Sequence, residues 1–158
     1  MTGKIAVGGI TRTDDLVVIR VLGARSSARF AGRTLNTLGK AGINIVCCAS
    51  FSDDRDRQNL ALAIHRKDLD QSLGLLQDIR EEIGAERIEV KRRCSAIAVY
   101  GPQFSSSPAI GGRIFDATDQ AGIEVQMIST SFTTVAFLID TDCAEAALAG
   151  LHETFLVP

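Results

Sequence analysis

Residues 32–43 read GRTLNTLGKAGI and residues 112–123 read GRIFDATDQAGI, so one frame recurs 80 positions further along the chain. The leading Gly-Arg pair and the closing Ala-Gly-Ile are identical in the two stretches. A Ser-Phe pair follows each stretch, at residues 50–51 and 131–132. Internal repetition of this kind indicates two copies of one structural unit.

The first copy predicts a complete βαββαβ unit. Residues 16–22 form a β-branched run that ends at Gly23 and indicates a strand. Apolar residues spaced by three and four between Ala31 and Leu38 indicate a helix, which Gly42 can end in a left-handed conformation. The same periodicities predict strands over 43–47 and 60–64, a helix over 69–83 and a strand over 88–90. This order is typical of a four-stranded antiparallel sheet with two helices on one face.

The second copy repeats the order but lacks its last strand. Its elements are expected over 96–100, 110–121, 123–131, 135–139 and 142–151. Ile5 and Val7 lie ahead of the first copy and belong to none of its elements, so we expect the N-terminal segment to pair into the second copy. The predicted fold class is α+β, with two interlocked ferredoxin-like domains. The first domain covers 15–92, and the second covers 93–158 plus an N-terminal strand over 3–8.

The predicted sheets carry apolar residues on both faces. Leu16, Val18 and Leu22 in one copy, and residues 96, 98 and 100 in the other, point away from the helices. A two-layer fold buries one face of its sheet, so the second apolar face needs a partner. We therefore expect the repeats to pair side by side and the chain to form a homodimer.

Composition excludes several classes of protein. The 158 residues are 46% hydrophobic, which excludes disorder. Because 17 Lys and Arg balance 19 Asp and Glu, neither nucleic acid nor an acidic membrane is an expected partner. No apolar run approaches the roughly 20 residues that span a bilayer, and the N-terminus has no signal-peptide core, so we expect a cytoplasmic protein. The four cysteines and two histidines lack metal-site spacing, and we interpret the cysteines as small buried hydrophobes.

Two further motifs resemble a known family. Residues 127–131 read MISTS and residues 147–155 read ALAGLHETF; TGKIA at residues 2–6 and the two Ala-Gly-Ile junctions add to them. Together they resemble the tandem ACT domains that form the regulatory half of aspartate kinases. The resemblance covers nearly the whole chain. It implies the interlocked topology described above.

The resemblance also implies a function. Aspartate kinases of this type bind lysine or threonine at ACT–ACT interfaces and transmit inhibition to a separate kinase domain. No glycine-rich phosphate loop followed by lysine occurs in this chain. We therefore expect a non-catalytic regulatory module without a cofactor, which would partner an amino-acid effector, a second copy of itself and an aspartate kinase catalytic subunit.

An amino-acid ligand suits this architecture. The loop before a helix presents backbone N–H groups at the positive helix end, where an α-carboxylate can bind, and the next strand can accept hydrogen bonds from the ammonium group. In the second copy, the resemblance places these contacts at Phe104, Ser106, Ser107, Pro108, Ala109, Ile110, Glu124, Val125, Gln126, Thr130 and Ser131. In the first copy, it places them at Ser26, Arg29, Phe30, Ala31, Asn44, Ile45 and Ser50.

The chain departs from the family's pattern at these positions. The family's D-K-P-G turn is replaced by SSAR over residues 26–29, where Arg29 either clamps a carboxylate or lies in solvent. In the second copy, Ala109 stands where the family has glycine. Gln126 and Phe132 replace acidic residues, which weakens the case for lysine more than that for a smaller amino acid. Two other hypotheses stay open: an assembly module that has lost effector binding, and a small enzyme, for which no catalytic constellation is visible.

Overall fold

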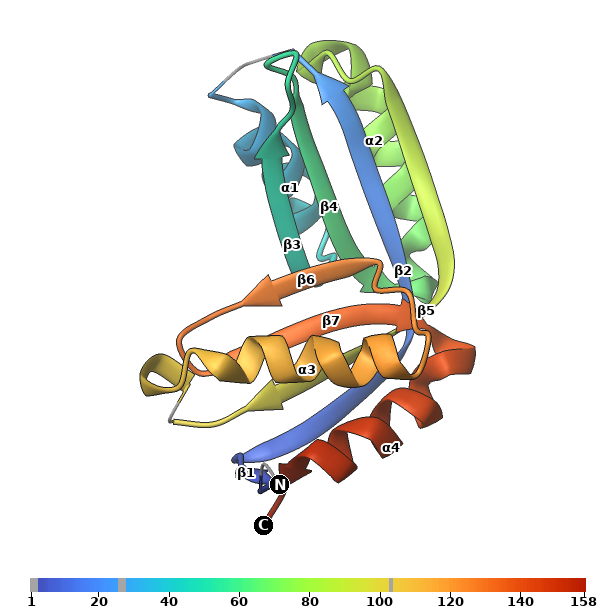
Figure 1. The fold of residues 1–158 in the computed structure, drawn as a ribbon. Helices are drawn as coiled ribbons and strands as arrows, with labels where there is room; N and C mark the ends of the chain where they lie inside the picture. The colour runs from blue at the N-terminus through green and yellow to red at the C-terminus, as the bar shows by residue number, and fades with distance from the viewer. Residues whose placement is uncertain (1–2, 26–27, 103) are drawn as a thin grey trace. The chain divides into compact units, whose positions relative to one another are not determined.

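The computed structural model describes residues 3–25, 28–102 and 104–158. The chain divides into two compact units (Figure 1). We call Asp15–Arg93 the first-copy unit. We call Cys94–Pro158, together with the residues up to Asp14, the second-copy unit. None of the helices of the described residues is long and apolar enough to cross a membrane.

The first-copy unit is a sheet covered on one face by two helices. Its elements are the later part of β2 (Gly9–Ala24), α1 (Phe30–Lys40), β3 (Ile45–Ser52), β4 (Gln58–His65), the short helix η1 (Arg66–Asp68), α2 (Leu69–Ile83) and the first part of β5 (Arg87–Tyr100). The strand order is β3-β4-β2-β5. Alternate residues of β2 and β4 pack with α1 and α2 in one core, which includes Ile19, Leu62, Leu38 and Leu76.

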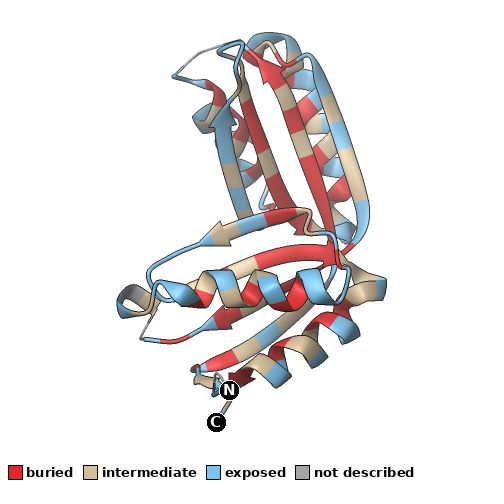
Figure 2. Cartoon of the chain, viewed as in Figure 1, coloured by how far each residue is buried: buried red, intermediate tan, exposed pale blue. Residues whose placement is uncertain are grey.

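The second-copy unit repeats this arrangement. Its elements are the first part of β2, the rest of β5, η2 (Phe104–Ser106), α3 (Ala109–Gln120), β6 (Met127–Thr130), β7 (Thr134–Asp140), η3 (Thr141–Cys143), α4 (Ala144–Thr154), and the short strands β1 (Ile5–Ala6) and β8 (Phe155–Leu156). The strand order is β2-β5-β7-β6. Ile97, Phe137, Ile114 and Leu151 are fully buried in its core, and in both units buried positions lie on the strands and on the helix faces that cover them (Figure 2).

Two long strands interlock the units. Both β2 and β5 begin in one unit and end in the other. At the boundary each has a residue with a left-handed backbone, Asp15 with φ 61° and Arg93 with φ 58°. Such conformations are uncommon for residues other than glycine and typically mark bulges or turns. The predicted fold class, two interlocked ferredoxin-like units with helices on one face, is confirmed.

The N-terminal segment differs from the expectation in detail. Ile5 and Ala6 pair in parallel with Phe155 and Leu156, as a separate two-stranded sheet. It is β2, from Gly9 onward, that supplies the strand beside β5 in the second-copy unit. The stronger pattern of β-branched residues from 16 to 22 concealed the start of β2, because the residues between Thr11 and Asp15 are polar.

Two other expectations are wrong. The strand predicted over 123–131 is only β6, because residues 123–126 still belong to the connection from α3. The cysteines are not all buried: Cys94 is buried and Cys47 and Cys143 are half-buried, but Cys48 is exposed on the edge strand β3. Burial together with the neighbouring Cys48 raises the pKa of the Cys47 thiol to about 11, so it stays protonated and unreactive near neutral pH.

Candidate functional site

The predicted ligand loop of the second copy begins where β5 ends. Gly101 is buried and donates its backbone N–H to the carbonyl of Thr133 at 2.8 Å. Thr133 lies in the turn between β6 and β7, and this turn is closed by the N–H of Ser131, which donates to the carbonyl of Thr134 at 2.8 Å. The start of the loop is thus tied to the turn that carries Thr130 and Ser131.

Three apolar side chains anchor the predicted segments on one core. Ile110 is buried, and Phe104 and Val125 are half-buried against the same cluster. Their side chains therefore serve packing, and only their backbone groups can reach a ligand. Ser107 and Ala109, between these anchors, are half-buried and exposed respectively. The loop is held at both ends and presents its middle to solvent.

The first turn of α3 is open to an anion. Pro108 occupies the N-cap, and no side-chain oxygen caps the helix. Gly111 and Gly112 follow in the first turn, and a Cβ atom on either would meet nothing within 4 Å. Uncapped amide groups at the positive end of a helix favour a carboxylate. Within this turn Ile110 already donates its N–H to the carbonyl of Ser107 at 3.1 Å, so a carboxylate would have to bind at the neighbouring amides.

The strand side of the predicted site is an open edge. β6 ends the strand order, so among the described residues no strand lies beside its outer edge. Glu124, Thr130 and Ser131 are exposed, whereas Gln126 is half-buried and donates its N–H to Leu138 at 2.7 Å. Four hollows of the described surface are lined by other residues. The exposed members of the predicted set thus lie on an open surface.

The first copy is less suited to a ligand. Ser26 lies outside the described residues. Arg29 occupies the N-cap of α1 with its backbone in the helical region and offers no side-chain cap. Phe30 is buried in the core, Ala31 is half-buried, and Ile45 packs against the core from the first turn of β3. The remaining predicted residues, Asn44 and Ser50, are both exposed.

Asn59 is a structural residue that the sequence reasoning missed. It is 5% exposed, and its Oδ1 accepts the backbone N–H of Gly23 at 3.0 Å. Its Nδ2 donates to Asp53 Oδ2 at 3.3 Å and to the carbonyl of Arg57 at 3.2 Å. One amide thus ties the turn between β3 and β4 to the end of β2. The sequence signal for this role was the alignment of Gly23 with Gly101. The backbone N–H of each glycine needs a hydrogen-bond acceptor at the same point of the fold.

Tyr100 is a second residue that the sequence reasoning missed. A Cβ atom on Gly9 would overlap the Tyr100 hydroxyl oxygen, and one on Gly8 would lie 3.2 Å from its ring. Gly8 also donates its N–H to the Tyr100 carbonyl at 2.7 Å. The ring therefore lies directly on the Gly8-Gly9 backbone, next to the start of the loop at Gly101. The adjacent glycines in the sequence were the signal for this close approach.

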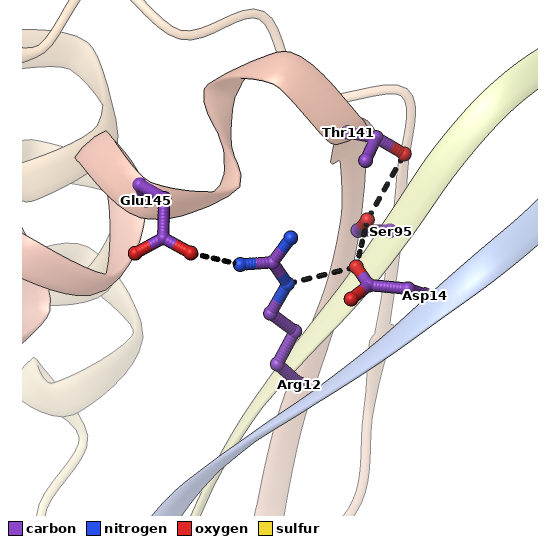
Figure 3. Close-up of polar contacts among 5 residues, drawn as sticks. All are labelled: Arg12, Asp14, Ser95, Thr141 and Glu145. Carbon is purple, nitrogen blue, oxygen red and sulfur yellow. Dashed lines mark hydrogen bonds and ion pairs between the residues drawn. The ribbon is translucent and has the colours of Figure 1, made fainter.

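A polar network joins β2, β5 and the start of α4 in the second-copy unit (Figure 3). The fully buried Ser95 donates its hydroxyl to Asp14 Oδ1 at 2.5 Å and lies 3.0 Å from Thr141 Oγ1. Arg12 Nε donates to the same carboxylate oxygen at 2.8 Å, and its guanidinium also pairs with Glu145. The Ser95 hydroxyl, and then Arg12, hold the pKa of Asp14 below its usual value. Every member has a partner within the network, so its role is structural.

With this geometry in view, comparison with known proteins identifies the fold. Residues 97–155 match the family model of the ACT domain. This part of the second-copy unit is an ACT domain. Its fold is that of the regulatory subunit of aspartate kinase from Thermus thermophilus in its ligand-free form, with a TM-score of 0.87 and 24% identity over 96% of this chain and 99% of that one. A structure of aspartokinase alpha and beta subunits gives a TM-score of 0.86 with 27% identity, covering 94% of this chain and 98% of that one.

The curated relatives that match the chain are longer proteins, named as aspartokinases. An aspartokinase of Bacillus sp. (strain MGA3) is 23% identical over 98% of this chain, and one from Thermus thermophilus is 26% identical over 95%. The chain spans less than two fifths of the length of either: 38% of the first and 37% of the second. The resemblance to the regulatory half of aspartate kinases, drawn from the MISTS strand and the closing helix, is confirmed.

Proposed function

We propose that this chain is a non-catalytic regulatory module of an aspartate kinase and that it senses an end-product amino acid of the threonine or lysine type. The observation that carries the proposal is the fold match over nearly the whole chain. A regulatory subunit of aspartate kinase matches 96% of this chain with a TM-score of 0.87, and a structure of aspartokinase alpha and beta subunits matches 94% of it with 27% identity. The partner in this proposal is an aspartate kinase catalytic subunit.

The open half-site of the second-copy unit supports an effector bound between ACT domains. The uncapped first turn of α3 offers amide groups for the α-carboxylate. The exposed Glu124, Thr130 and Ser131 offer oxygen atoms for the ammonium group. Because this arrangement is open on the side of β6, a second ACT domain must cover it to exclude water from the ligand. A homodimer paired along its edge strands supplies that cover.

Thermal unfolding of the purified chain with each of the twenty amino acids tests the proposal. A ligand at 100 times its Kd stabilises the folded state by about 2.7 kcal/mol, which raises Tm by roughly 5 °C or more in a chain of this size. We expect one amino acid to give this shift and calorimetric titration to confirm it. Ser107→Leu should abolish the shift by blocking the loop, whereas Thr11→Leu, an exposed polar-to-apolar change on β2 of the same unit, should leave it intact.

The alternative is an ACT-type assembly module that has lost effector binding. The first copy favours it, because Arg29 occupies the helix start and Phe30 is committed to the core. Under this alternative no amino acid shifts Tm, and Ser107→Leu changes neither the stability of the chain nor its oligomeric state as measured by analytical ultracentrifugation. A shift with any single amino acid that Ser107→Leu removes rejects the assembly module.

A further inference from the structure

A hollow of about 550 Å³ lies in the first-copy unit at the C-terminal end of α2. It is lined by Arg25, Arg57, Gln77, Arg80, Glu81 and residues 84–86. Three guanidinium groups and two carboxylates thus surround one small volume.

Two of these five charges are fixed within the wall of the hollow. Arg80 Nε donates to the carbonyl of Ala85 at 3.2 Å, and its terminal nitrogen donates to the carbonyl of Glu86. Glu86 is held from the other side, because its carboxylate fills the space beside Gly23, where a Cβ atom would lie 2.7 Å from Oε2. Both groups therefore shape the hollow rather than await a ligand.

The other three charges have capacity to spare. Arg57 lies 3.8 Å from Glu86, which is an ion pair but too long for a hydrogen bond. Neither Arg25 nor Glu81 makes a side-chain hydrogen bond or ion pair with any residue that the structure describes. The stem of Arg25 lies over Gly84, where a Cβ atom would approach it to 3.1 Å. Gly84 has φ 65°, a backbone conformation that favours glycine. Because glycine has no Cβ, the space that the Arg25 stem occupies stays open.

We propose that this hollow binds an acidic α-amino acid. Two guanidinium groups with donors to spare, Arg25 and Arg57, match two carboxylates, since a guanidinium binds a carboxylate through two parallel hydrogen bonds. One uncommitted carboxylate, Glu81, matches one ammonium group. The lining of three arginines and two glutamates carries a net charge of one positive, which the net negative charge of the ligand neutralises. A neutral amino acid leaves one guanidinium unmatched, and a basic one opposes the net charge.

This site is independent of the proposed effector site. None of the predicted effector residues that the structure describes lines it, and all of its lining residues belong to the first-copy unit. It does not rest on the proposed function, and the two proposals fail separately. Ser107→Leu, which blocks the effector loop of the second copy, should leave binding in this hollow unchanged.

Calorimetric titration of the full chain with L-glutamate and with L-aspartate tests the proposal. We expect one of them to bind with one site per chain. Arg25→Gln and Glu81→Gln should each weaken binding by about tenfold or more, because each removes a charge-assisted contact. Glu82→Gln and Arg33→Gln are matched controls, since these neighbouring side chains pair with each other at 2.8 Å outside the hollow and should leave the affinity unchanged.

Ligand analogues test the two halves of the assignment. Succinate lacks the ammonium group and L-glutamine lacks the second carboxylate, so each should bind at least about tenfold more weakly than the matching acidic amino acid. Equal binding of succinate overturns the role of Glu81. Absence of binding by both acidic amino acids, or binding that Arg25→Gln leaves unchanged, overturns the site. Because Arg25, Glu81 and the control positions are exposed, unfolding of the variants is not expected, and thermal unfolding without ligand verifies this.

Discussion

The two copies satisfy an equivalent backbone N–H with different hydrogen-bond acceptors. In each, the strand that precedes the first helix ends at a glycine whose N–H must be satisfied beside the next hairpin. In the first copy, Gly23 donates to the side chain of Asn59 at 3.0 Å. In the second copy, Gly101 donates to the backbone carbonyl of Thr133 at 2.8 Å. The demand for a hydrogen bond belongs to the fold, whereas the group that meets it is free to change.

The buried hydroxyl groups of the two helices show the same freedom. Thr34 in α1 aligns with Ile114 in α3, and Leu38 aligns with Thr118, so the threonine has moved by one turn. Both threonines are fully buried, and each donates at 2.9 Å to a carbonyl of its own helix, Thr34 to Phe30 and Thr118 to Phe115. A hydroxyl satisfied within its own helix needs nothing from the opposite layer, so the core accepts it at either position.

Truncation of the first core residue of each helix should produce the largest effect. Phe30 and Ile110 align, are each 2% exposed, and belong to separate cores. We expect Phe30→Ala to cost about 3–5 kcal/mol and Ile110→Ala about 2–5 kcal/mol of unfolding free energy, because each leaves a cavity. Urea unfolding measures both. A cost below about 1 kcal/mol for either variant contradicts the view that the two copies depend equally on this position.

Removal of the Asn59 side chain should distinguish the two copies most clearly. This side chain accepts the hydrogen bond that a backbone carbonyl accepts in the second copy. Asn59→Ala leaves the buried N–H of Gly23 without an acceptor and should cost about 1–3 kcal/mol. The matched change in the second copy, Thr133→Ala, keeps the carbonyl that Gly101 uses and should be within about 0.5 kcal/mol of neutral. Urea unfolding gives both values, and amide hydrogen exchange reports on Gly23 and Gly101 directly. Equal costs for the two variants reject this account.

More of the fold than of the candidate site could be predicted from the sequence. Periodicity and the repeat fixed the order of elements, because helices and strands bury residues at regular spacings that survive divergence between copies. The start of β2 was missed, because Thr11, Arg12 and Asp14 are polar. The role of Asn59 was also missed, because its partner Gly23 is 36 positions away and only the folded chain brings them together. Of the candidate ligand residues, Phe104 and Ile110 could be assigned to the core only once their packing was known.

The close approach of Tyr100 to Gly8-Gly9 has no counterpart in the first copy, where Leu22 aligns with Tyr100. Gly9→Ala places a methyl group where the Tyr100 hydroxyl lies. Since Tyr100 is 42% exposed and can swing outward, we expect a cost of only about 1 kcal/mol. Gly3→Ala is the matched control, because a Cβ there meets nothing within 4 Å. Removal of the ring by Tyr100→Ala should cancel the effect of Gly9→Ala, and a double-mutant cycle without coupling rejects the contact.

The smallest expected effect concerns acid and compares one carboxylate in each unit. Asp53 in the first-copy unit accepts the backbone N–H groups of Arg57 and Arg55, and these bonds, that of Arg57 foremost, lower its pKa. Asp14 in the second-copy unit has its pKa lowered by the Ser95 hydroxyl and then by Arg12. A carboxyl group whose pKa is lower in the folded state stabilises the fold above its unfolded pKa of about 3.9, and this contribution disappears as the pH falls through the folded value.

The contribution of these two carboxylates to the free energy of unfolding should therefore be constant from pH 7 to about 5. It should decline below about pH 4. Carboxyl NMR titration should place the pKa values of Asp14 and Asp53 below the unfolded value of about 3.9. Asp14→Asn and Asp53→Asn should each flatten the decline in urea unfolding between pH 5 and pH 2. Because Asp14 is exposed and pairs with the charged Arg12, whereas the half-buried Asp53 is held mainly by backbone N–H groups, salt should weaken the effect of Asp14 more than that of Asp53. The opposite order rejects the assignment of an ion pair to Asp14 and of backbone hydrogen bonds to Asp53.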